Sequence, residues 1–244
     1  MLLPFDFLLL ALIVIGLPIR AWFSMRELRA APPEALRGLR ARLWTRAILS
    51  QWLLVAAVAA LWMWQRRWWS GLNVAARFGP MEVGMLIGIA VLAFLLDRQR
   101  RALAGQPEVV ERLRVRLAPV QGLMPEDRTE WWHFAALAVT AGVCEEVLFR
   151  GYVTWALAHV LPSYTIAALA QAAIFGIAHA YQGARGVWTT FMVGLFLTVV
   201  VWLTGTLWVA MLIHALMDLN AGDLALRVRM LGAQKTGPEG PGLR

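Results

Sequence analysis

Long apolar runs recur along this 244-residue chain, and most approach the length that an α-helix needs to cross a bilayer. The hydrocarbon core is about 30 Å thick, so a spanning helix needs about 20 mostly apolar residues. Hydrophobic residues make up 60% of the chain and charged residues only 16%, against roughly 25% charged in soluble domains. We therefore predict an all-α polytopic membrane protein with about seven transmembrane helices, or eight if the longest run is divided. The predicted spans are residues 5–19, 47–64, 81–96, 131–160, 164–180, 187–204 and 206–220.

The N-terminal run is predicted to be a transmembrane helix rather than a cleaved signal peptide. It carries Asp6 in place of a positively charged n-region, and no small-residue cleavage site of the A-x-A kind follows. The spans and the polar stretches between them divide the chain into four predicted parts. These are a three-helix membrane part at residues 1–96, a polar cytoplasmic loop at 97–130 that lies on the membrane surface or forms a solvated linker, a membrane core at 131–222, and a flexible basic tail at 223–244.

The arginines give the orientation of the chain. Residues 20–46 and 97–130 each hold seven arginines, whereas residues 65–80 hold three. Cytoplasmic loops carry the excess of Lys and Arg, so the first and third loops are predicted to face the cytoplasm. Seven spans then leave the N-terminus outside and the C-terminus inside, in a cell (inner) membrane. The net charge of +8 is thereby explained by topology and by attraction to the lipid bilayer, and we expect no nucleic-acid partner.

Three ionisable residues lie in the middle of the apolar stretch AVTAGVCEEVLFRGYVTWAL, at residues 138–157. A charged side chain at the centre of a spanning helix costs about 2.5–3.5 kcal/mol on insertion scales. Glu146 and Arg150 are four residues apart, so they share a helix face and can pair. Glu145 faces elsewhere and has no partner on its own helix. This surplus carboxylate is the feature that most strongly indicates a functional site.

Few other polar groups lie at membrane depth, and they are expected to be partners of Glu145. His179 ends an apolar run, with Phe175 one turn before it, and His214 shares a helix face with Asp218. We therefore predict that side chains from three separate helices converge on one shared intramembrane cavity, namely Glu145, Glu146, His179, His214 and Asp218. His133 and His159 lie near the ends of their span and are expected to be ordinary interfacial residues.

The chemistry that such a cavity supports is hydrolysis. A carboxylate in an apolar, partly dry pocket is suited to act as a general base toward water, and a nearby imidazole can orient that water or stabilise an oxyanion. The sequence contains no H-E-x-x-H motif, and its serines lie in no G-x-S-x-G setting.

Three motifs resemble those of the CPBP family, which comprises the CAAX proteases and bacteriocin-processing (ABI) proteins. They are Glu145-Glu146-x-x-x-Arg150, Phe175-x-x-x-His179 and His214-x-x-x-Asp218. The resemblance covers residues 131 to about 222 and implies a glutamate-dependent intramembrane endopeptidase that acts on membrane-anchored protein or peptide tails. It implies that Glu145 activates water and His179 positions it. By the same resemblance, Glu146 and Arg150 hold the site together.

The third motif is expected to stabilise the oxyanion, but it departs from the family pattern. The family often has Asn at the position of Asp218, and an ionised Asp cannot donate a hydrogen bond. Asp218 would therefore have to be protonated or would instead orient His214. Cys144, the single cysteine, precedes the two glutamates. It is either a small apolar packing residue or an accessory thiol for acyl transfer, as in a myxosortase-like sorting branch of the family.

Two alternatives remain open on the sequence alone. Glu145, Glu146, His179 and His214 also form a plausible ligand set for Zn²⁺, although the guanidinium of Arg150 opposes a cation there. We accordingly expect no metal or other cofactor. The other alternative is a non-enzymatic membrane scaffold or immunity protein that keeps the fold, and charges retained at membrane depth without use argue against it.

Overall fold

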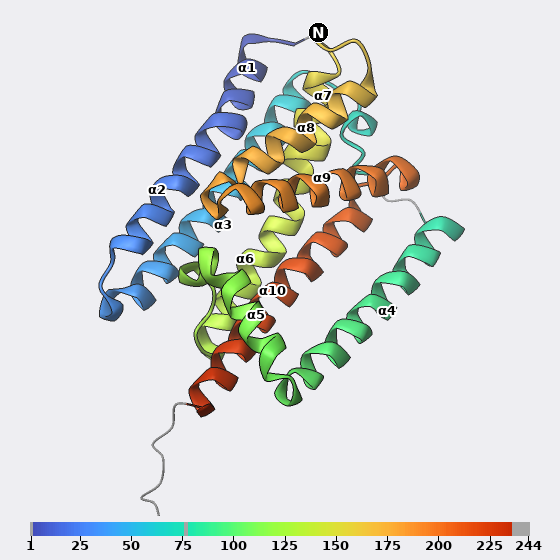
Figure 1. Ribbon diagram of the computed structural model, residues 1–244. Coiled ribbons are helices and arrows are strands. Elements are labelled where there is room, and N and C mark those ends of the chain that lie inside the picture. Colours follow the sequence, from blue (N-terminus) through green and yellow to red (C-terminus); the bar gives the residue numbers. More distant parts are fainter. Residues whose placement is uncertain (1, 76–77, 236–244) are drawn as a thin grey trace, which may run out of the picture.

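The computed structural model describes residues 2–75 and 78–235, and within these residues the chain is entirely helical, with no strand (Figure 1). Six of the helical segments are long and apolar enough to cross a membrane, and α8 is a shorter apolar helix. The predicted all-α polytopic membrane fold is therefore confirmed. The helices are α1 (Pro4–Ala11), α2 (Leu17–Ala30), α3 (Pro33–Trp64), α4 (Pro80–Ala102), α5 (Pro107–Leu117), α6 (Arg128–Glu145), α7 (Thr154–Leu157), α8 (Tyr164–Ala178), α9 (Ala184–Thr204) and α10 (Trp208–Lys235).

Shorter helical turns connect several of these elements. Two π-helical segments join helices end to end, Leu12–Gly16 between α1 and α2 and Glu146–Val153 between α6 and α7. Short 3₁₀ turns occupy Trp69–Leu72, Leu103–Gly105, Ala118–Leu123 and Ala180–Gln182. Because the π-helices continue the helices on either side, residues 4–30 and 128–157 each form one long span. The long apolar run expected at 131–160, which has charged residues at its centre, is thus a single span.

The arginine-rich segment 20–46, expected to be a loop, is instead the lower half of a helical hairpin. Helix α2 continues to Ala30, and α3 begins at Pro33 after a turn at residues 31–32. A proline in the first turn of a helix is favourable, because its missing N–H has no intrahelical partner there. Apolar side chains on both helices bury one another, namely Met25, Leu28, Leu39 and Leu43. The arginines therefore lie on helices that extend beyond the most apolar part of each span.

The segment 97–130 and the expected tail are also more helical than the sequence predicted. Helix α5 is amphipathic and packs its buried Val110 against Val228 of α10, while Arg112 and Arg116 are exposed. This contact stabilises the end of α10, which runs on to Lys235. The flexible tail predicted at 223–244 is therefore helical as far as Lys235, and residues 236–244 lie outside the described residues.

Helix α6 starts at a well-formed N-cap. The Asp127 carboxylate accepts hydrogen bonds from the backbone N–H groups of Thr129 and Glu130, both at 2.9 Å. The Glu130 N–H, with help from the guanidinium of Arg37, holds the pKa of Asp127 below its usual range. The cap is one of the favourable arrangements for a helix N-terminus and fixes where the central helix begins.

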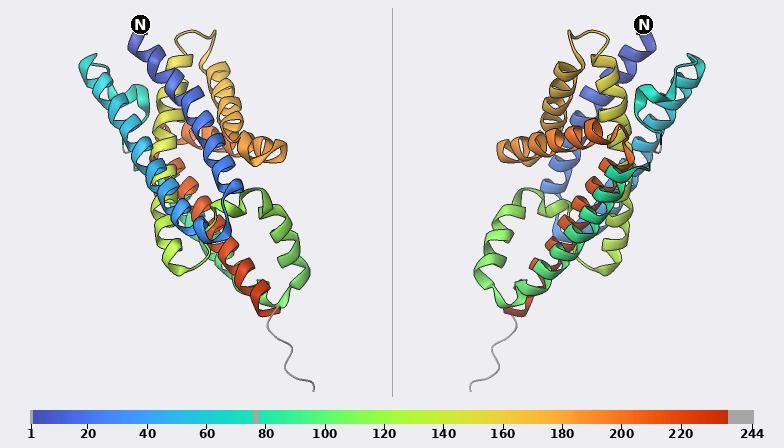
Figure 2. Two further views of the ribbon diagram at one scale, coloured as in Figure 1. Left: turned by 90° about the vertical axis from the view of Figure 1, so that its left-hand side faces the viewer. Right: turned by 90° about the vertical axis from the view of Figure 1, so that its right-hand side faces the viewer.

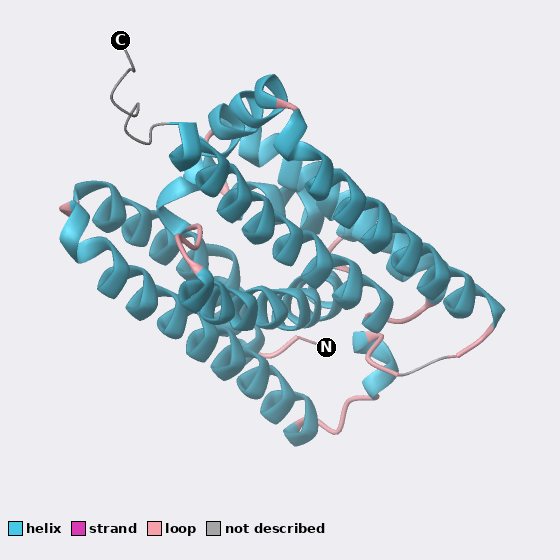
Figure 3. Ribbon diagram, turned by 90° about the horizontal axis from the view of Figure 1, so that it is seen from below, coloured by secondary structure: helices cyan, strands magenta, loops and turns pink. Residues whose placement is uncertain are grey.

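Helix α6 lies at the centre of the bundle, between α3 on one side and α10 on the other. Helix α9 crosses the other helices at a steep angle, and α4 lies on the flank, packed mainly along α10 (Figures 1 and 2). The view from below in Figure 3 shows that short loops join the helices around this centre. The polar motifs are carried by the central helices α6, α8 and α10, so packing brings them together.

Candidate functional site

A cavity of about 480 Å³ lies between α2, α3, α6, α8, α9 and α10. Four of the predicted site residues line it, Glu145, His179, His214 and Asp218. Most of the remaining wall is apolar, with side chains such as Trp44 contributed by α3. The polar groups of three motifs therefore face one space within an otherwise apolar interior.

Glu146 was predicted to face the same cavity, but it does not line it and is fully buried behind the wall. Its Oε1 accepts a hydrogen bond from Arg150 Nη1 at 2.9 Å, which confirms the pairing predicted from their spacing. The same oxygen accepts a second bond from His214 Nδ1 at 2.8 Å. One carboxylate thus links the π-helix after α6 to helix α10 and fixes the direction of the His214 ring.

Phe175 is the packing centre of the site. The Arg150 guanidinium lies over its ring, with Cζ 4.0 Å from the centroid, a cation–π contact in a buried setting. The ring centroid of His179 lies 4.8 Å from that of Phe175, and His214 approaches the ring edge-on at 6.1 Å. Phe175 therefore separates the two histidines and restricts the orientation of both.

Glu145 has a different environment from its neighbour in the chain. Its Oε1 accepts a hydrogen bond from the side-chain amide of Gln51 on α3 at 2.9 Å. Within the described residues 2–75 and 78–235, no ion pair involves Glu145. Glu146, in contrast, contacts both Arg150 and His214. Of the two adjacent glutamates, Glu145 is therefore the one that lines the cavity and has no ion-pair partner among the described residues.

Gln51 is a site residue that sequence reasoning missed. It lies in the apolar run 47–64, where a side-chain amide at membrane depth was the available signal. Buried amides of this kind are normally hydrogen-bonded between helices, and its partner is on α6, 94 residues away in the sequence. No local motif links the two positions.

His179 follows the last residue of α8, and its tautomer can be inferred from its partner. Its Nδ1 lies 2.8 Å from the carbonyl oxygen of Phe175. A carbonyl only accepts, so Nδ1 must carry the hydrogen. In the neutral ring Nε2 is then an acceptor. This arrangement suits a side chain that receives a hydrogen bond from a water molecule.

His214 and Asp218 lie on one face of α10, as their spacing predicted. His214 Nε2 is 3.7 Å from Asp218 Oδ2, which is beyond ordinary hydrogen-bond distance. Because Glu146 takes the Nδ1–H, Nε2 is the nitrogen that His214 directs toward Asp218. The Asp218 carboxylate thus lies beside Nε2 of His214 without a direct hydrogen bond to it.

Cys144 lies apart from these groups. It is a fully buried free thiol and is not among the residues that line the cavity. In the described part of the chain, no three His, Cys, Asp or Glu side chains are grouped so that they could hold one metal ion. The side chains of the Zn²⁺ ligand set considered from the sequence are thus not grouped as ligands of one ion among these residues.

A second buried charge cluster, which the sequence did not suggest, lies near the N-terminal end of the first span. The Asp6 carboxylate is fully buried and pairs with both Nη atoms of Arg67, at 2.8 and 2.6 Å. Tyr152 donates its hydroxyl to the same carboxylate at 3.0 Å. Arg67 also lies over the ring of Trp155, 4.4 Å from the centroid. This cluster ties the first helix to the π-helix that holds Arg150.

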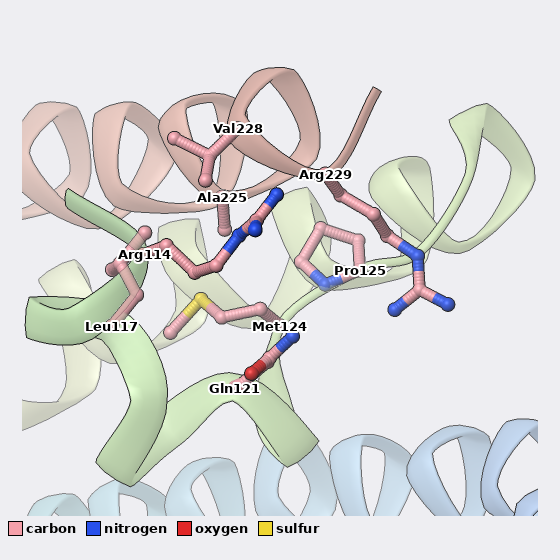
Figure 4. Close-up of a pocket in the computed structure, with 8 residues that line it drawn as sticks. All are labelled: Arg114, Leu117, Gln121, Met124, Pro125, Ala225, Val228 and Arg229. Carbon is pink, nitrogen blue, oxygen red and sulfur yellow. The ribbon is translucent and has the colours of Figure 1, made fainter. Parts of the chain in front are cut away.

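A smaller pocket lies between α5 and α10 (Figure 4). It shares Leu117 and Met124 with the main cavity wall. Its two arginines both have carboxylate partners, since Arg114 pairs with Glu111 at 3.2 Å. Arg229 likewise pairs with Glu126, at 2.8 Å. Neither charged side chain that lines this pocket therefore lacks an ionic partner.

Comparison with known proteins identifies the central segment of the chain. Residues 127–220 match the family model for type II CAAX prenyl endopeptidases, Rce1-like. No curated protein and no solved structure matches the chain. The matched segment extends from the N-cap of α6 into α10 and contains all three motifs, and it supports an intramembrane endopeptidase. Residues 127–220 are thus similar to the Rce1-like CAAX prenyl endopeptidases, and this match bears out the predicted resemblance to the CPBP proteases.

Proposed function

We propose that this protein is a glutamate-dependent intramembrane endopeptidase that cleaves the C-terminal tails of membrane-anchored proteins or peptides. The observation that carries the proposal is the difference between the two adjacent glutamates. Glu146 is bound by Arg150 and His214, whereas Glu145 faces the cavity and, among the described residues, accepts a bond only from the neutral amide of Gln51. A carboxylate without a cationic partner in an apolar cavity is available to remove a proton.

In the proposed reaction, Glu145 takes a proton from a water molecule whose other hydrogen is directed to Nε2 of His179. The resulting hydroxide attacks the scissile carbonyl carbon and forms a tetrahedral oxyanion. Glu145 then returns the proton to the leaving amide nitrogen as the C–N bond breaks. The products are a carboxylic acid and an amine, so one water is consumed and Glu145 is regenerated.

The oxyanion requires a hydrogen-bond donor at the moment when its charge develops. In the proposal this donor is Nε2–H of a doubly protonated His214. Glu146 on the inner nitrogen and Asp218 near the outer nitrogen are anionic neighbours of that cation. Asp218 then acts by orienting His214, which removes the need for Asp218 itself to donate.

Arg150 and Phe175 are positioning residues in this scheme. Arg150 neutralises Glu146, and its position over Phe175 holds the ring that separates His179 from His214. The proposed orientation in a cell membrane places the N-terminus outside, following the arginine-rich lower ends of α2 and α3. The substrate would then be a tail reaching the cavity from the cytoplasmic half of the bilayer.

The test is a comparison of membrane-protein C-termini in cells that express the parent chain or the Glu145→Gln variant. The parent is expected to yield shortened C-termini that are absent from the variant. Glu27→Gln, which removes an exposed carboxylate on α2, is the matched control and should behave as the parent. Identical C-termini in parent and variant would instead support a scaffold or immunity role without catalysis.

A further inference from the structure

Arg20 on α2 is the one lysine or arginine among the described residues that line the main cavity. It lies in the wall together with apolar side chains of the α2–α3 hairpin, such as Leu17 and Leu43. The predicted site residues account for the acidic groups and imidazoles of the cavity, but they leave this cation without a role.

Arg20 has no acidic partner in the part of the chain that the structure describes. Its Nη1 donates to the backbone carbonyl of Arg46 at 3.0 Å. Across residues 2–75 and 78–235, no ion pair includes Arg20, and its buried Nε has no hydrogen-bond partner. Arg20 is half-buried, and the two fully buried arginines both have carboxylate partners, Arg40 with Glu130 and Arg150 with Glu146. A guanidinium that lacks such a partner, in a cavity wall, is suited to bind an anion from outside the chain.

The offset between Arg20 and Glu145 along α3 can be estimated from the residues that anchor them. Arg20 is anchored to the carbonyl of Arg46, and Glu145 is anchored to Gln51 further along the same helix. At about 1.5 Å of rise per residue, these two anchor points are separated by about 7.5 Å along the helix axis. An extended peptide advances about 3.3–3.6 Å per residue, so about two or three residues bridge that distance. A peptide bound through its end at Arg20 therefore reaches Glu145 with a bond close to that end.

We propose that Arg20 binds the C-terminal carboxylate of the substrate and thereby selects a free chain end within reach of Glu145. The planar guanidinium matches the geometry of a carboxylate, and the apolar wall around it accepts the side chains of the last residues. This assignment rests on the proposed endopeptidase function, because it gives the same cavity a specificity-determining residue. It predicts that an amide at the chain end, which carries no charge, binds less well.

Binding, rather than cleavage, provides the test, so the Glu145→Gln variant is the background for every measurement. Two N-palmitoylated, dye-labelled short apolar peptides are compared by fluorescence anisotropy, one with a free C-terminal carboxylate and one with a C-terminal amide. The carboxylate peptide is expected to bind about tenfold or more tightly than the amide, as for a charge-assisted hydrogen bond. Arg20→Met should remove this difference, and Arg20→Lys should restore part of it.

Arg46→Met is the matched control, because it removes an exposed arginine from the same hairpin and leaves the carbonyl that holds Arg20. It should keep the full preference for the carboxylate peptide. Equal binding of the two peptides to the Arg20 protein overturns the proposal, as does a preference that survives Arg20→Met. Equal binding by the protein that retains Arg20 refutes the proposal even where the Arg20→Met variant folds poorly.

A second arm distinguishes a peptide carboxylate from a lipid phosphate. The measurements are repeated in nanodiscs of phosphatidylcholine with and without phosphatidylglycerol. The carboxylate preference should persist with the anionic lipid present. If the anionic lipid abolishes it, Arg20 binds lipid headgroups and the proposal is wrong. Either failure leaves Glu145-dependent cleavage untouched, since that function is tested separately through C-termini in cells.

Discussion

Two clusters of charged side chains are buried in this membrane protein, and they differ in how their carboxylates are bound. In the Asp6 cluster (Asp6, Arg67 and Tyr152), both carboxylate oxygens have two hydrogen-bond partners. In the Glu146 cluster (Glu146, Arg150 and His214), only Oε1 is used, and Oε2 has no partner among the described residues.

The two clusters also differ in what lies beside them. No member of the Asp6 cluster lines the main cavity, whereas the Glu146 cluster reaches it through His214 and lies next to Glu145 in the chain. Burial of charge is therefore not in itself a sign of function in this chain. A saturated cluster fastens helices together, and a cluster that borders a cavity and holds an imidazole toward it can take part in chemistry. The following predictions test this distinction.

The largest expected effect is that of Glu145→Gln on the rate of cleavage. The change keeps the size of the side chain but removes the base, so the rate should fall by about 10²- to 10⁴-fold. The melting temperature should change little, because Glu145 takes part in no ion pair of the described residues. The measurement is cleavage by purified protein of a peptide taken from a substrate found in the C-terminal comparison. A variant with parental activity would rule out Glu145 as the base.

Next in size is the effect of Arg150→Met on stability. It leaves Glu146 charged, fully buried and deprived of its guanidinium partner, at a cost of about 3–5 kcal/mol. Thermal unfolding in detergent measures the loss. The double variant Glu146→Gln with Arg150→Met should recover part of the stability but not the activity. A single variant as stable as the parent would show that Glu146 is not held as a carboxylate.

Removing Arg67 from the other cluster should affect stability and leave catalysis intact. Arg67→Met deprives Asp6 of its bidentate partner but leaves the bonds from Tyr152 and the backbone of Leu3. The expected loss is about 1.5–3 kcal/mol, the range for hydrogen bonds to a charged group. Activity per folded molecule should stay within a few-fold of the parent. A selective loss of activity would mean that the Asp6 cluster takes part in the site and does not only fasten helices together.

Close packing between α6 and α10 sets the distance that joins Glu146 to His214. A Cβ added at Gly142 would lie 2.7 Å from the backbone nitrogen of Ala215, which follows His214. Gly142→Ala should therefore separate the helices, cost about 1–3 kcal/mol and lower activity as well. Gly88→Ala on α4, where nothing lies within 4 Å of the new Cβ, is the control and should be neutral or stabilising. Equal melting temperatures for the two variants would contradict this packing.

The sequence could predict one cluster because its members follow helical spacing. Glu146 and Arg150 lie four apart, as do His214 and Asp218, and apolar runs of spanning length give the fold class. Asp6 and Arg67 lie 61 residues apart, and Gln51 lies 94 residues from Glu145. These contacts depend on how α1, α3 and α6 pack, which no local pattern encodes. Residues 20–46 were likewise predicted to be a loop although most of them are helical. Their many arginines lower the hydropathy of the segment, so the apolar positions that pack the hairpin do not stand out.

The smallest expected effect is that of Cys144→Ala, and it separates hydrolysis from a thiol-dependent sorting reaction. Cys144 is fully buried and does not line the cavity, so its sulfur has no path to a substrate carbonyl in this arrangement. Replacing it removes one buried sulfur atom, at a cost on the order of 1 kcal/mol. Cleavage should survive within a few-fold, and a strong chelator added to the parent should leave the rate unchanged. The parent protein, quenched during turnover, should show no acyl adduct by mass spectrometry. An adduct on Cys144 that disappears in Cys144→Ala, together with lost activity, would instead make the thiol the nucleophile and Glu145 its base. Activity lost on chelation and restored by Zn²⁺ would transfer Glu145 and the two histidines to a metalloprotease mechanism.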